Sequence, residues 1–287
     1  VIRSIVLTCL VGLLPPTAVG QTIVWTDADA RRIQRKDVKG GEVETIVQFQ
    51  SPQGASIIHY DPITAKLYYL FYGPPTSYQR ANLDGSEPEN IPTPSWGGLA
   101  LNVELRKLYW TNSGSIYRSE LNGAGVESHF YASCCLGPLE ALGDDLFFGG
   151  AGGGIDKGIW RADADGSNER FLHVSPEPFD LAHDPVENKL YLATINAIYR
   201  LNPDGTGFHE IGAAGAAPLI VVDSRARKVY WGGWRGIRRS NLDGSNVEDF
   251  VTATDAGNPN LDLQGLTIVY NSTPIPTLSG LRLTVMG

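Results

Sequence analysis

Short apolar and aromatic segments alternate with polar turn residues along almost the whole chain. A representative stretch runs from Leu99 to Gly123: an apolar segment LALN, an aromatic segment KLYWTN, and a segment SIYRSE that ends at a turn. Short segments of this kind, bounded by turn residues, are typical of half-buried strands. No long stretch shows the apolar spacing of about 3.6 residues that an amphipathic helix requires. The pattern therefore predicts an all-β protein.

The third kind of segment recurs six times as an apolar residue, any residue and an arginine, with a glycine five residues after the arginine. The arginine and glycine pairs are Arg35 and Gly40, Arg80 and Gly85, Arg118 and Gly123, Arg161 and Gly166, Arg200 and Gly205, and Arg239 and Gly244. Successive arginines are 45, 38, 43, 39 and 39 residues apart. A period near 40 residues is typical of repeat architectures, so the chain consists of six equivalent units.

Five of the six glycines follow an Asp or Asn, as in Asp84-Gly85 and Asn122-Gly123. Such dipeptides between apolar segments favour a type I′ hairpin turn, because these residues tolerate positive φ. Each unit therefore contains a hairpin whose first strand carries the arginine. We interpret the arginines as structural, with stems packed on aromatic strands and guanidinium groups bonded to the backbone or to carboxylates of the adjacent unit. A ring of six arginines that binds anions is disfavoured by the net charge of −8.

An apolar strand and an aromatic strand precede most of these hairpins. Four short antiparallel strands in a unit of about 40 residues make up one blade of a β-propeller. The first unit begins at Ile23 without an apolar strand in front of it, whereas residues 261–270 form an unpaired apolar run after the sixth unit. We predict that this run becomes the innermost strand of blade 1. This pairing closes a six-bladed ring over residues 21–270 and removes its open edges.

Several aromatic strands resemble the YWTD repeats of low-density-lipoprotein-receptor-type six-bladed propellers. The matching segments are Trp25-Thr26-Asp27, Tyr109-Trp110-Thr111-Asn112 and Val229-Tyr230-Trp231, with Leu-Asp-Gly turns at 83–85 and 242–244. The resemblance covers nearly all of the repeat region and implies a binding protein. The Asp of the motif survives only as Asp27, so the role in bracing neighbouring blades that the resemblance implies for it is not expected in most blades.

Composition and charge disfavour several classes of partner. The 287 residues include 33 Gly, 18 Pro and 12 Tyr, as is common in soluble all-β proteins, and a net charge of −8 without any block of Lys or Arg. Nucleic acids and anionic membranes reward clustered positive charge, so neither is expected as a partner. The glycine-rich run 149–154 lacks the Lys-Ser/Thr ending of a phosphate-binding loop, and we interpret it as a hairpin loop. We expect a monomer without a cofactor.

Both ends of the chain have features of export. Residues 1–20 are predicted to be a signal peptide, with Arg3, an apolar run at 5–14 and a small-residue cleavage site before Gln21. The apolar run is too short to span a bilayer. Residues 271–287 form a Pro/Thr tail whose segment 274–278 (PIPTL) resembles the start of a bacterial C-terminal sorting segment of the IPTL type. The alternative is an unstructured tail. We expect an exported bacterial protein that is secreted, periplasmic or on the cell surface.

Two adjacent cysteines, Cys134 and Cys135, remain after removal of the signal peptide. An exported protein allows either a strained vicinal disulfide or a pair of reduced thiols in a loop, and the sequence leaves both open. A zinc site is disfavoured, because the two cysteines and the nearby His129 lack the spacing of zinc ligands.

Binding residues are expected where the units differ. The loop before the arginine strand is longest in blades 1, 2 and 4, where it contains residues 27–32, 73–77 and 149–158. In an antiparallel blade this loop emerges on the same face as the connections between blades, and aromatic residues on such loops are typical of binding surfaces. The candidates are Tyr72, Trp96, Phe179 and Trp234. The alternative is that Trp96 and Phe179 plug the channel or cap the core.

We therefore predict a non-enzymatic propeller that binds a protein or a surface glycan through this face. The competing hypothesis is a metal-dependent, lactonase-like hydrolase or a lyase with its site in the central channel, for which Asn102, Glu140 and Gln264 are candidates. A third is a purely structural envelope module. His59 and His183 occupy equivalent positions before Asp-Pro turns, so we interpret both as architectural. The sequence contains no nucleophile elbow or zinc-helix motif, which favours binding over catalysis.

Overall fold

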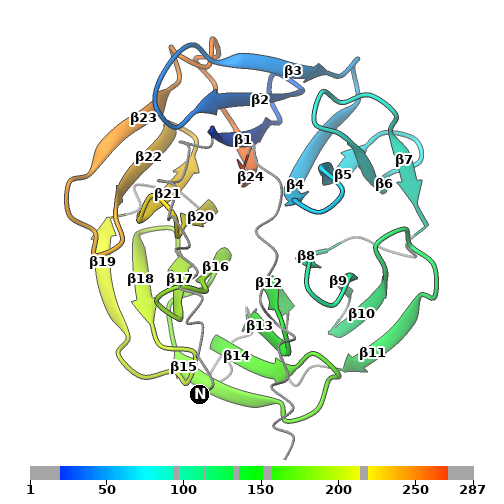
Figure 1. Cartoon of the computed structure of the whole chain (residues 1–287), viewed down its shortest axis with the longest axis vertical. Helices are drawn as coiled ribbons and strands as arrows, with labels where there is room; N and C mark the ends of the chain where they lie inside the picture. Colours follow the sequence, from blue (N-terminus) through cyan, green and yellow to red (C-terminus); the bar gives the residue numbers. More distant parts are fainter. Residues whose placement is uncertain are drawn as a thin grey trace, which may run out of the picture.

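A computed structural model describes residues 20–92, 97–112, 114–131, 136–150, 157–213 and 219–270. These segments form 24 strands in six antiparallel four-stranded sheets, and the described residues include no helix. The sheets surround a central channel like the blades of a propeller, each with one strand at the channel and one at the rim (Figure 1). The predicted fold, a six-bladed all-β propeller, is confirmed.

Within each blade the strands follow one another from the channel to the rim. Blade 1 contains β24 (Leu263–Tyr270), β1 (Gln21–Asp27), β2 (Arg32–Asp37) and β3 (Glu44–Gln48); blade 2 contains β4 (Gly54–Asp61), β5 (Lys66–Tyr72), β6 (Ser77–Asn82) and β7 (Glu89–Ile91); blade 3 contains β8 (Leu99–Asn102), β9 (Lys107–Asn112), β10 (Ser115–Glu120) and β11 (Glu127–Tyr131). Blade 4 contains β12 (Leu136–Leu142), β13 (Asp145–Gly150), β14 (Gly158–Asp163) and β15 (Arg170–Val174); blade 5 contains β16 (Asp180–Asp184), β17 (Lys189–Ala193), β18 (Ala197–Leu201) and β19 (His209–Ala213); blade 6 contains β20 (Leu219–Asp223), β21 (Lys228–Gly233), β22 (Gly236–Asn241) and β23 (Glu248–Thr252).

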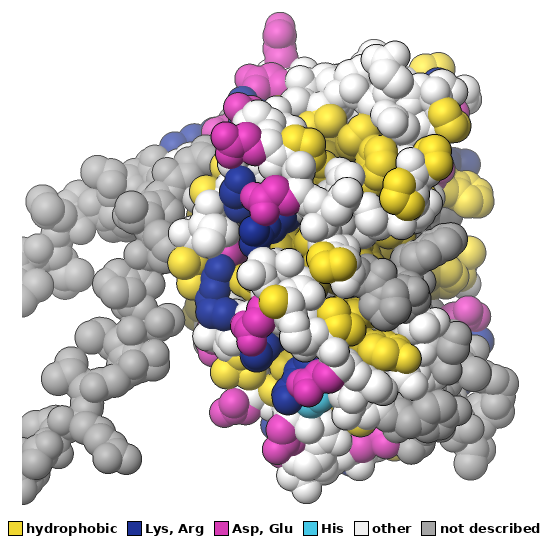
Figure 2. Space-filling model, turned by 90° about the vertical axis from the view of Figure 1, so that its right-hand side faces the viewer, with side chains coloured by type: hydrophobic (Ala, Val, Ile, Leu, Met, Phe, Trp, Pro, Cys, Tyr) yellow, Lys and Arg dark blue, Asp and Glu magenta, His cyan; other side chains and the backbone are white. Residues whose placement is uncertain are grey.

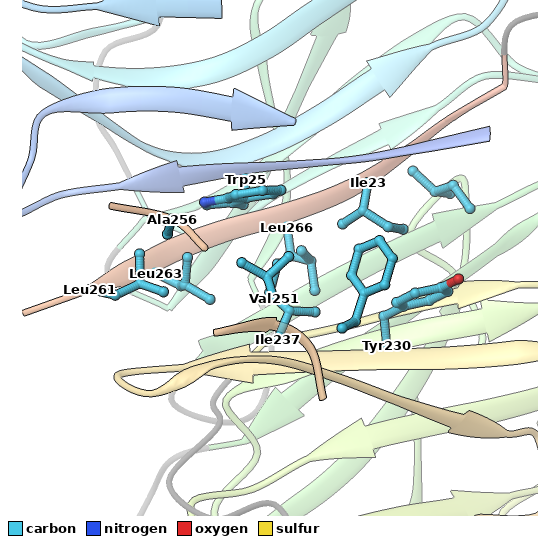
Figure 3. Packing of buried hydrophobic residues seen from close by; sticks show 11 residues of the cluster. Ile23, Trp25, Tyr230, Ile237, Val251, Ala256, Leu261, Leu263 and Leu266 are labelled. Atoms are coloured by element: carbon cyan, nitrogen blue, oxygen red, sulfur yellow. The ribbon is translucent and has the colours of Figure 1, made fainter. Parts of the chain in front are cut away.

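The C-terminal strand β24 closes the ring, as predicted. It pairs antiparallel with β1, from Gln21 opposite Tyr270 to Asp27 opposite Leu263. In Figure 3, Trp25 of β1 and Leu266 of β24 belong to one buried cluster with Val251 of blade 6, so the closing strands also seal the junction between blades 6 and 1. The cluster is continuous across the two ends of the repeat region, which is why the last blade does not leave an open face.

Asp27, the acidic residue that matches the motif, acts at this junction. Its side chain is fully buried and forms an ion pair with Arg32 at 3.3 Å. The Asn258 side-chain amide donates to it at 3.0 Å from the segment that leads from blade 6 into β24. Asp27 therefore anchors the closing segment onto blade 1.

The hairpin turns differ from the predicted type I′. In blade 2 the Gly85 N–H donates to the Asn82 carbonyl at 2.9 Å, and the Asn82 N–H donates to the Ser86 carbonyl at 2.9 Å. Within this three-residue loop only Gly85 has positive φ, at 79°. This is a type I turn followed by a glycine bulge. The Asp84 carboxylate accepts the Ser86 N–H at 2.9 Å, which stabilises this turn without requiring positive φ at Asp84.

Close contact with the preceding blade is a second reason for the repeated glycines. A Cβ atom at Gly244 would lie 1.8 Å from the carbonyl oxygen of Ile211, on the outer strand of blade 5. At Gly205 it would lie 2.5 Å from the carbonyl oxygen of Leu172, on the outer strand of blade 4. Gly40 is different, because no atom lies within 4 Å of the corresponding position. In the other five units the glycine of the repeat thus marks the seam where the turn meets the blade before it.

The repeated arginines form ion pairs within their own blades. Four pair with a glutamate directly opposite on the outer strand: Arg35 with Glu44, Arg80 with Glu89, Arg118 with Glu127 and Arg239 with Glu248. Arg161 and Arg200 pair with Asp145 and Glu187 of their own blades. The prediction of carboxylate partners in the adjacent blade is wrong, because a residue directly opposite on the neighbouring strand is closer. Figure 2, which views the side formed by blades 2 and 3, shows such acidic and basic side chains next to one another.

Contacts of these arginines with the next blade go to its backbone instead. Arg239 Nη1 donates to the Val38 carbonyl of blade 1 at 2.7 Å, and Arg118 Nη1 reaches the Ala164 carbonyl of blade 4 at 3.5 Å. Stems also lie near aromatic rings, as Arg239 does over Phe250 at 5.1 Å from the ring centroid. These contacts are those of residues that join strands and blades.

The glycine seam can be tested by substitution. We expect Gly244→Ala to lower the free energy of unfolding by about 1–3 kcal/mol, because the new Cβ meets the Ile211 carbonyl and the residue has a φ of 84°. Gly212→Ala on the neighbouring outer strand is the control, since its Cβ meets nothing within 4 Å, and we expect a change within about 0.5 kcal/mol. Guanidinium denaturation measures both. Equal losses in the two variants would contradict the seam.

Candidate functional site

A cavity of about 620 Å³ lies at one mouth of the central channel. All six channel strands contribute to its wall, mainly through residues near their amino-terminal ends. The lining residues are Ile57, Ile58 and His59 of β4, Leu99 of β8, Thr111 of β9, Gly137, Pro138 and Leu139 of β12, Asp180 of β16, Leu219 of β20, Leu263, Gln264, Gly265 and Leu266 of β24, and Gly97, Gly98, Glu177, Pro178, Phe179 and Trp234 of the connecting loops. Loops from several blades thus converge on one concave site.

The described chain ends lie at the other end of the channel. The part of β24 that lines the cavity is Leu263 to Leu266, whereas the strand runs on to Tyr270, which pairs with Gln21. Because β24 extends along the channel, both of these terminal residues are remote from the cavity mouth. Gln21 and Tyr270 therefore lie at the opposite face.

Three of the channel strands carry a β-bulge in the cavity wall. The register with the second strand shifts at Ile57 in β4, at Gly137 and Pro138 in β12, and at Gln264 in β24. The channel strands of blades 3, 5 and 6 pair with their neighbours without such a shift. Bulges re-aim side chains and are frequent next to functional sites. Blades 1, 2 and 4, whose loops are longest, therefore also have irregular channel strands at the cavity.

Backbone strain accompanies one of these bulges. Ile57 has a φ of 44°, which is a rare conformation for a β-branched residue. The neighbouring channel strand approaches closely at this point, since a Cβ at Gly265 would lie 2.8 Å from the Ile58 nitrogen and 2.9 Å from the Ile57 nitrogen. Strained residues persist where the surrounding structure fixes them, and they cluster at functional sites. The strain at Ile57 distinguishes this wall from an ordinary blade junction.

The polar groups of the channel satisfy backbone groups of the next blade. The Asp180 carboxylate accepts the Ile220 N–H of blade 6 at 2.9 Å, and Glu140 accepts the His183 N–H of blade 5. The His59 ring donates to the Leu99 carbonyl of blade 3. The channel edge of each blade has backbone groups without a partner strand, and these side chains provide the missing hydrogen bonds.

Burial shifts the protonation of these groups toward their neutral forms. It raises the pKa of Asp180 to about 7, despite hydrogen bonds from the Ile220 and Leu181 N–H groups. It raises the pKa of Glu140 to about 8, with a further contribution from the nearby Asp180 charge. Burial also lowers the pKa of His59 to about 4, so this ring is neutral at pH 7. The surrounding protein disfavours each charge, although all three residues keep part of their surface exposed.

Two of the predicted binding residues lie at the cavity. Phe179 and Trp234 line it, and they remain 44% and 68% exposed, so neither plugs the channel. Tyr72 is 36% exposed but does not line the cavity, and its hydroxyl hydrogen-bonds Ser56 at 2.6 Å. Trp96 lies outside the described residues, as do Cys134, Cys135, the loop segment 151–156, residues 1–19 and the tail 271–287.

The three candidate residues of the enzyme hypothesis form hydrogen bonds in different parts of the structure. Asn102 is fully buried at the far end of β8, where its amide donates to the Gly143 carbonyl at 2.8 Å and accepts the Leu105 N–H at 2.9 Å. The Gln264 amide donates to Asp262 at 2.8 Å. Glu140 contacts blade 5 instead, so these three do not converge. In the part of the chain that is described, no group of three His, Cys, Asp or Glu side chains could hold a metal ion.

His59 and Asp180 are the site residues that sequence reasoning missed. The strand register places His59 and Glu140 opposite Tyr68 and Phe147, the same position that holds Ala100 in blade 3. The hydrogen bond from His59 to Leu99 supports the architectural interpretation of this residue in part, but His59 also lines the cavity. Blades 3, 5 and 6 have alanine or valine at this position, so the polar residue was the available signal for His59 and Glu140.

Comparison with known proteins identifies the fold but no family. No protein-family model matches the chain, and no curated protein matches it. A chain in the crystal structure of a nidogen/laminin complex is similar with a TM-score of 0.76 and 18% identity, over 88% of this chain and 100% of that chain. TolB from Acinetobacter baumannii aligns with a TM-score of 0.70 and 13% identity, over 87% of this chain and 66% of that chain. A putative TolB from Agrobacterium tumefaciens aligns with a TM-score of 0.61 and 15% identity, over 88% and 99% of the two chains.

At these identities the similarity establishes a shared propeller fold and nothing finer. The described residues also contain no helix that is long and apolar enough to cross a membrane.

The shifted carboxyl groups predict a specific dependence of stability on pH. In the native state Glu140 keeps its proton up to a pKa of about 8, whereas in the unfolded chain it loses it near pH 4.5, so its contribution to stability falls as pH rises between these values. We expect Glu140→Gln to match the wild type near pH 5 and to exceed it by about 1–3 kcal/mol at pH 9 in urea denaturation.

Glu248→Gln is the control, because Arg239 holds the pKa of Glu248 below its usual range. We expect no growing advantage for this variant between pH 6 and pH 9. If the free energy of unfolding of Glu140→Gln depends on pH as that of the wild type does between pH 5 and pH 9, the pKa of Glu140 is not raised.

Proposed function

We propose that this protein is a binding module that recognises another protein or a surface glycan at the cavity face. The observation that carries the proposal is the coincidence of three channel-strand bulges and two exposed aromatic side chains, Phe179 and Trp234, at one cavity. A regular six-fold repeat needs none of these irregularities for folding, since blades 3, 5 and 6 have channel strands without them. Loops on a rigid scaffold are where binding residues concentrate.

The two aromatic side chains have the character of interface anchors. Large exposed rings bury much apolar area on binding and are enriched among the residues that dominate interface energetics. Phe179 belongs to the connection from blade 4 to blade 5, and Trp234 lies between β21 and β22 of blade 6. Because the sheets behind these side chains are rigid, less conformational entropy is lost when a partner docks.

The placement of the chain ends suits such a role. We propose that residues 1–20 direct export and that the tail 271–287 is a C-terminal sorting segment. The described ends of the ring, Gln21 and Tyr270, pair with each other at the face opposite the cavity. A propeller held by either end therefore presents the cavity outwards. This arrangement favours a secreted, periplasmic or surface-bound module with an accessible cavity over one whose cavity is covered.

The similarity to known structures adds support for protein binding. One similar chain comes from a nidogen/laminin complex, so a propeller of this shape occurs in a complex of two proteins. We further propose that the chain is a divergent YWTD-type propeller, on the strength of its aromatic strands and of Asp27 at the closing junction. No described constellation favours the lactonase-like or lyase alternative, because its three candidate residues are engaged separately.

The proposal predicts that one face carries the binding energy. The purified protein would be screened on a glycan array and against envelope proteins, and any hit would be purified and its Kd measured by calorimetry. We expect Trp234→Ala to weaken binding by about 10-fold or more, as for a central interface aromatic, and Phe179→Ala to weaken it as well.

Val186→Ala serves as the matched control, since Val186 is 71% exposed in the turn between β16 and β17, away from the cavity lining. We expect this variant to bind like the wild type. A ligand whose Kd is unchanged by both cavity substitutions, or is changed by Val186→Ala instead, would show that the partner uses another face.

A further inference from the structure

We infer that the cavity takes a primary ammonium group, such as a lysine side chain of the partner, which binds the Asp180 carboxylate within the aromatic mouth. This inference rests on the proposed function, because it names the chemistry of the ligand that the cavity face would bind. It is carried by the charge of the wall, by the hydrogen bonding of Asp180 and by the exposed rings beside it.

The cavity wall is acidic. Its charged residues are Glu177 and Asp180, and its lining includes no Lys or Arg among the described residues. Glu177 forms an ion pair with Lys157 at 3.4 Å, so its charge is balanced at the rim. Asp180 forms no such pair with any described residue, and the neighbouring Glu140 forms none either. Asp180 is therefore the carboxyl group of the wall that has no cation beside it, and Glu140 is near it but is not part of the lining.

Two other buried carboxylates of the ring are neutralised by arginine. Asp27 is fully buried and pairs with Arg32 at 3.3 Å, and Asp61 is fully buried and pairs with Arg106 at 2.8 Å. A carboxylate surrounded by protein is costly unless it has a partner of opposite charge. Asp184 and Asp223 are fully buried as well and form no ion pair with a described residue. Asp180 differs from all four in that it lines the cavity, so a ligand there can supply the opposite charge.

The hydrogen bonding of Asp180 leaves room for such a partner. One carboxylate oxygen accepts the Leu181 N–H at 2.9 Å and the other accepts the Ile220 N–H at 2.9 Å. Each oxygen can accept a further hydrogen bond. These two bonds fix the orientation of the carboxylate, so a ligand need not order it. An ammonium group, which is a compact charge, needs only one of these positions, whereas a guanidinium binds best when both oxygens can be reached in one plane.

The remaining groups around Asp180 do not compete for it. His59 across the channel is neutral, because burial lowers its pKa to about 4. Burial also lowers the pKa of His183, whose ring stacks on Phe147 at 6.2 Å between centroids. Phe179 is adjacent in sequence to Asp180, and Trp234 lines the same cavity. The faces of exposed aromatic rings attract cations, most strongly for tryptophan.

Protonation of the Asp180 carboxyl makes ammonium binding measurable through its dependence on pH. Since the pKa of Asp180 is raised to about 7, an arriving ammonium group displaces the proton that part of the Asp180 carboxyl population carries. Binding should therefore release protons near pH 7. It should also tighten between pH 6 and pH 8, a range in which lysine stays fully charged.

The test uses three short peptides that differ at one residue, Ac-Gly-Ser-X-Ser-Gly-amide with X as lysine, norleucine or arginine, titrated into the whole chain by calorimetry and by NMR. At pH 8 we expect the lysine peptide to bind about 10-fold more tightly than the norleucine peptide, as for a hydrogen bond to a charged group. The preference should shrink at pH 6, and proton release should appear as a dependence of the heat on the buffer. We expect Asp180→Asn to abolish the preference.

Asp249→Asn is the matched control, because Asp249 lies on the exposed outer strand of blade 6 and pairs with Arg238. We expect it to keep the preference for lysine. If Asp180→Asn does not fold, the pH dependence and proton release of the wild type still decide the matter. The inference is overturned if the lysine peptide fails to bind at millimolar concentration, if norleucine or arginine binds equally well, or if Asp180→Asn keeps the preference.

This failure can be told apart from failure of the proposed function. If a protein or glycan ligand loses affinity in Trp234→Ala but not in Asp180→Asn, the cavity face binds its ligand without an ammonium group. If neither substitution affects any ligand, the face itself is not the binding surface.

Discussion

The antiparallel pairing of β24 with β1 is the interaction on which the rest of the structure depends. Each blade can bury its two faces only against its neighbours, so an open ring would expose one face of blade 1 and one of blade 6. The pairing joins residues that are about 240 positions apart, and it brings Trp25 and Leu266 into one cluster with blade 6. The Asp27 carboxylate then fixes the segment that leads into β24 through Asn258.

Closure also creates the chemistry of the channel. Six strand edges face one another across it, and their backbone groups need partners other than a further strand. Side chains of the preceding blade supply some of them, as Asp180 does for Ile220 and Glu140 for His183. One of these carboxyl groups, that of Asp180, also lines the cavity and contributes to its acidic character. Structural and functional roles coincide in this residue, so sequence position alone would classify it as architectural.

The sequence predicted the blades well because a period near 40 residues and turn chemistry are local properties. It did not predict the turn type or the seam, since the need for Gly244 depends on Ile211 of another blade. The loops identified Phe179 and Trp234, because exposed aromatics on connections can be recognised without a structure. Asp180 and His59 were missed for the opposite reason, because their role depends on which strand edge they face. For His59, the bulge at Ile57 also shifts the register that would place it.

The irregular blades explain how a repeat can bind a ligand in one orientation. A mouth built from six identical units would offer the same contacts in six directions, and a small ligand group would have no preferred one. The bulges in blades 1, 2 and 4 and the carboxyl groups of blades 4 and 5 remove this equivalence. Strain at Ile57 and the unfavourable burial of Asp180 are costs to stability of the kind that proteins accept at functional sites. The departure from symmetry is therefore the property of this ring that a specific partner would recognise.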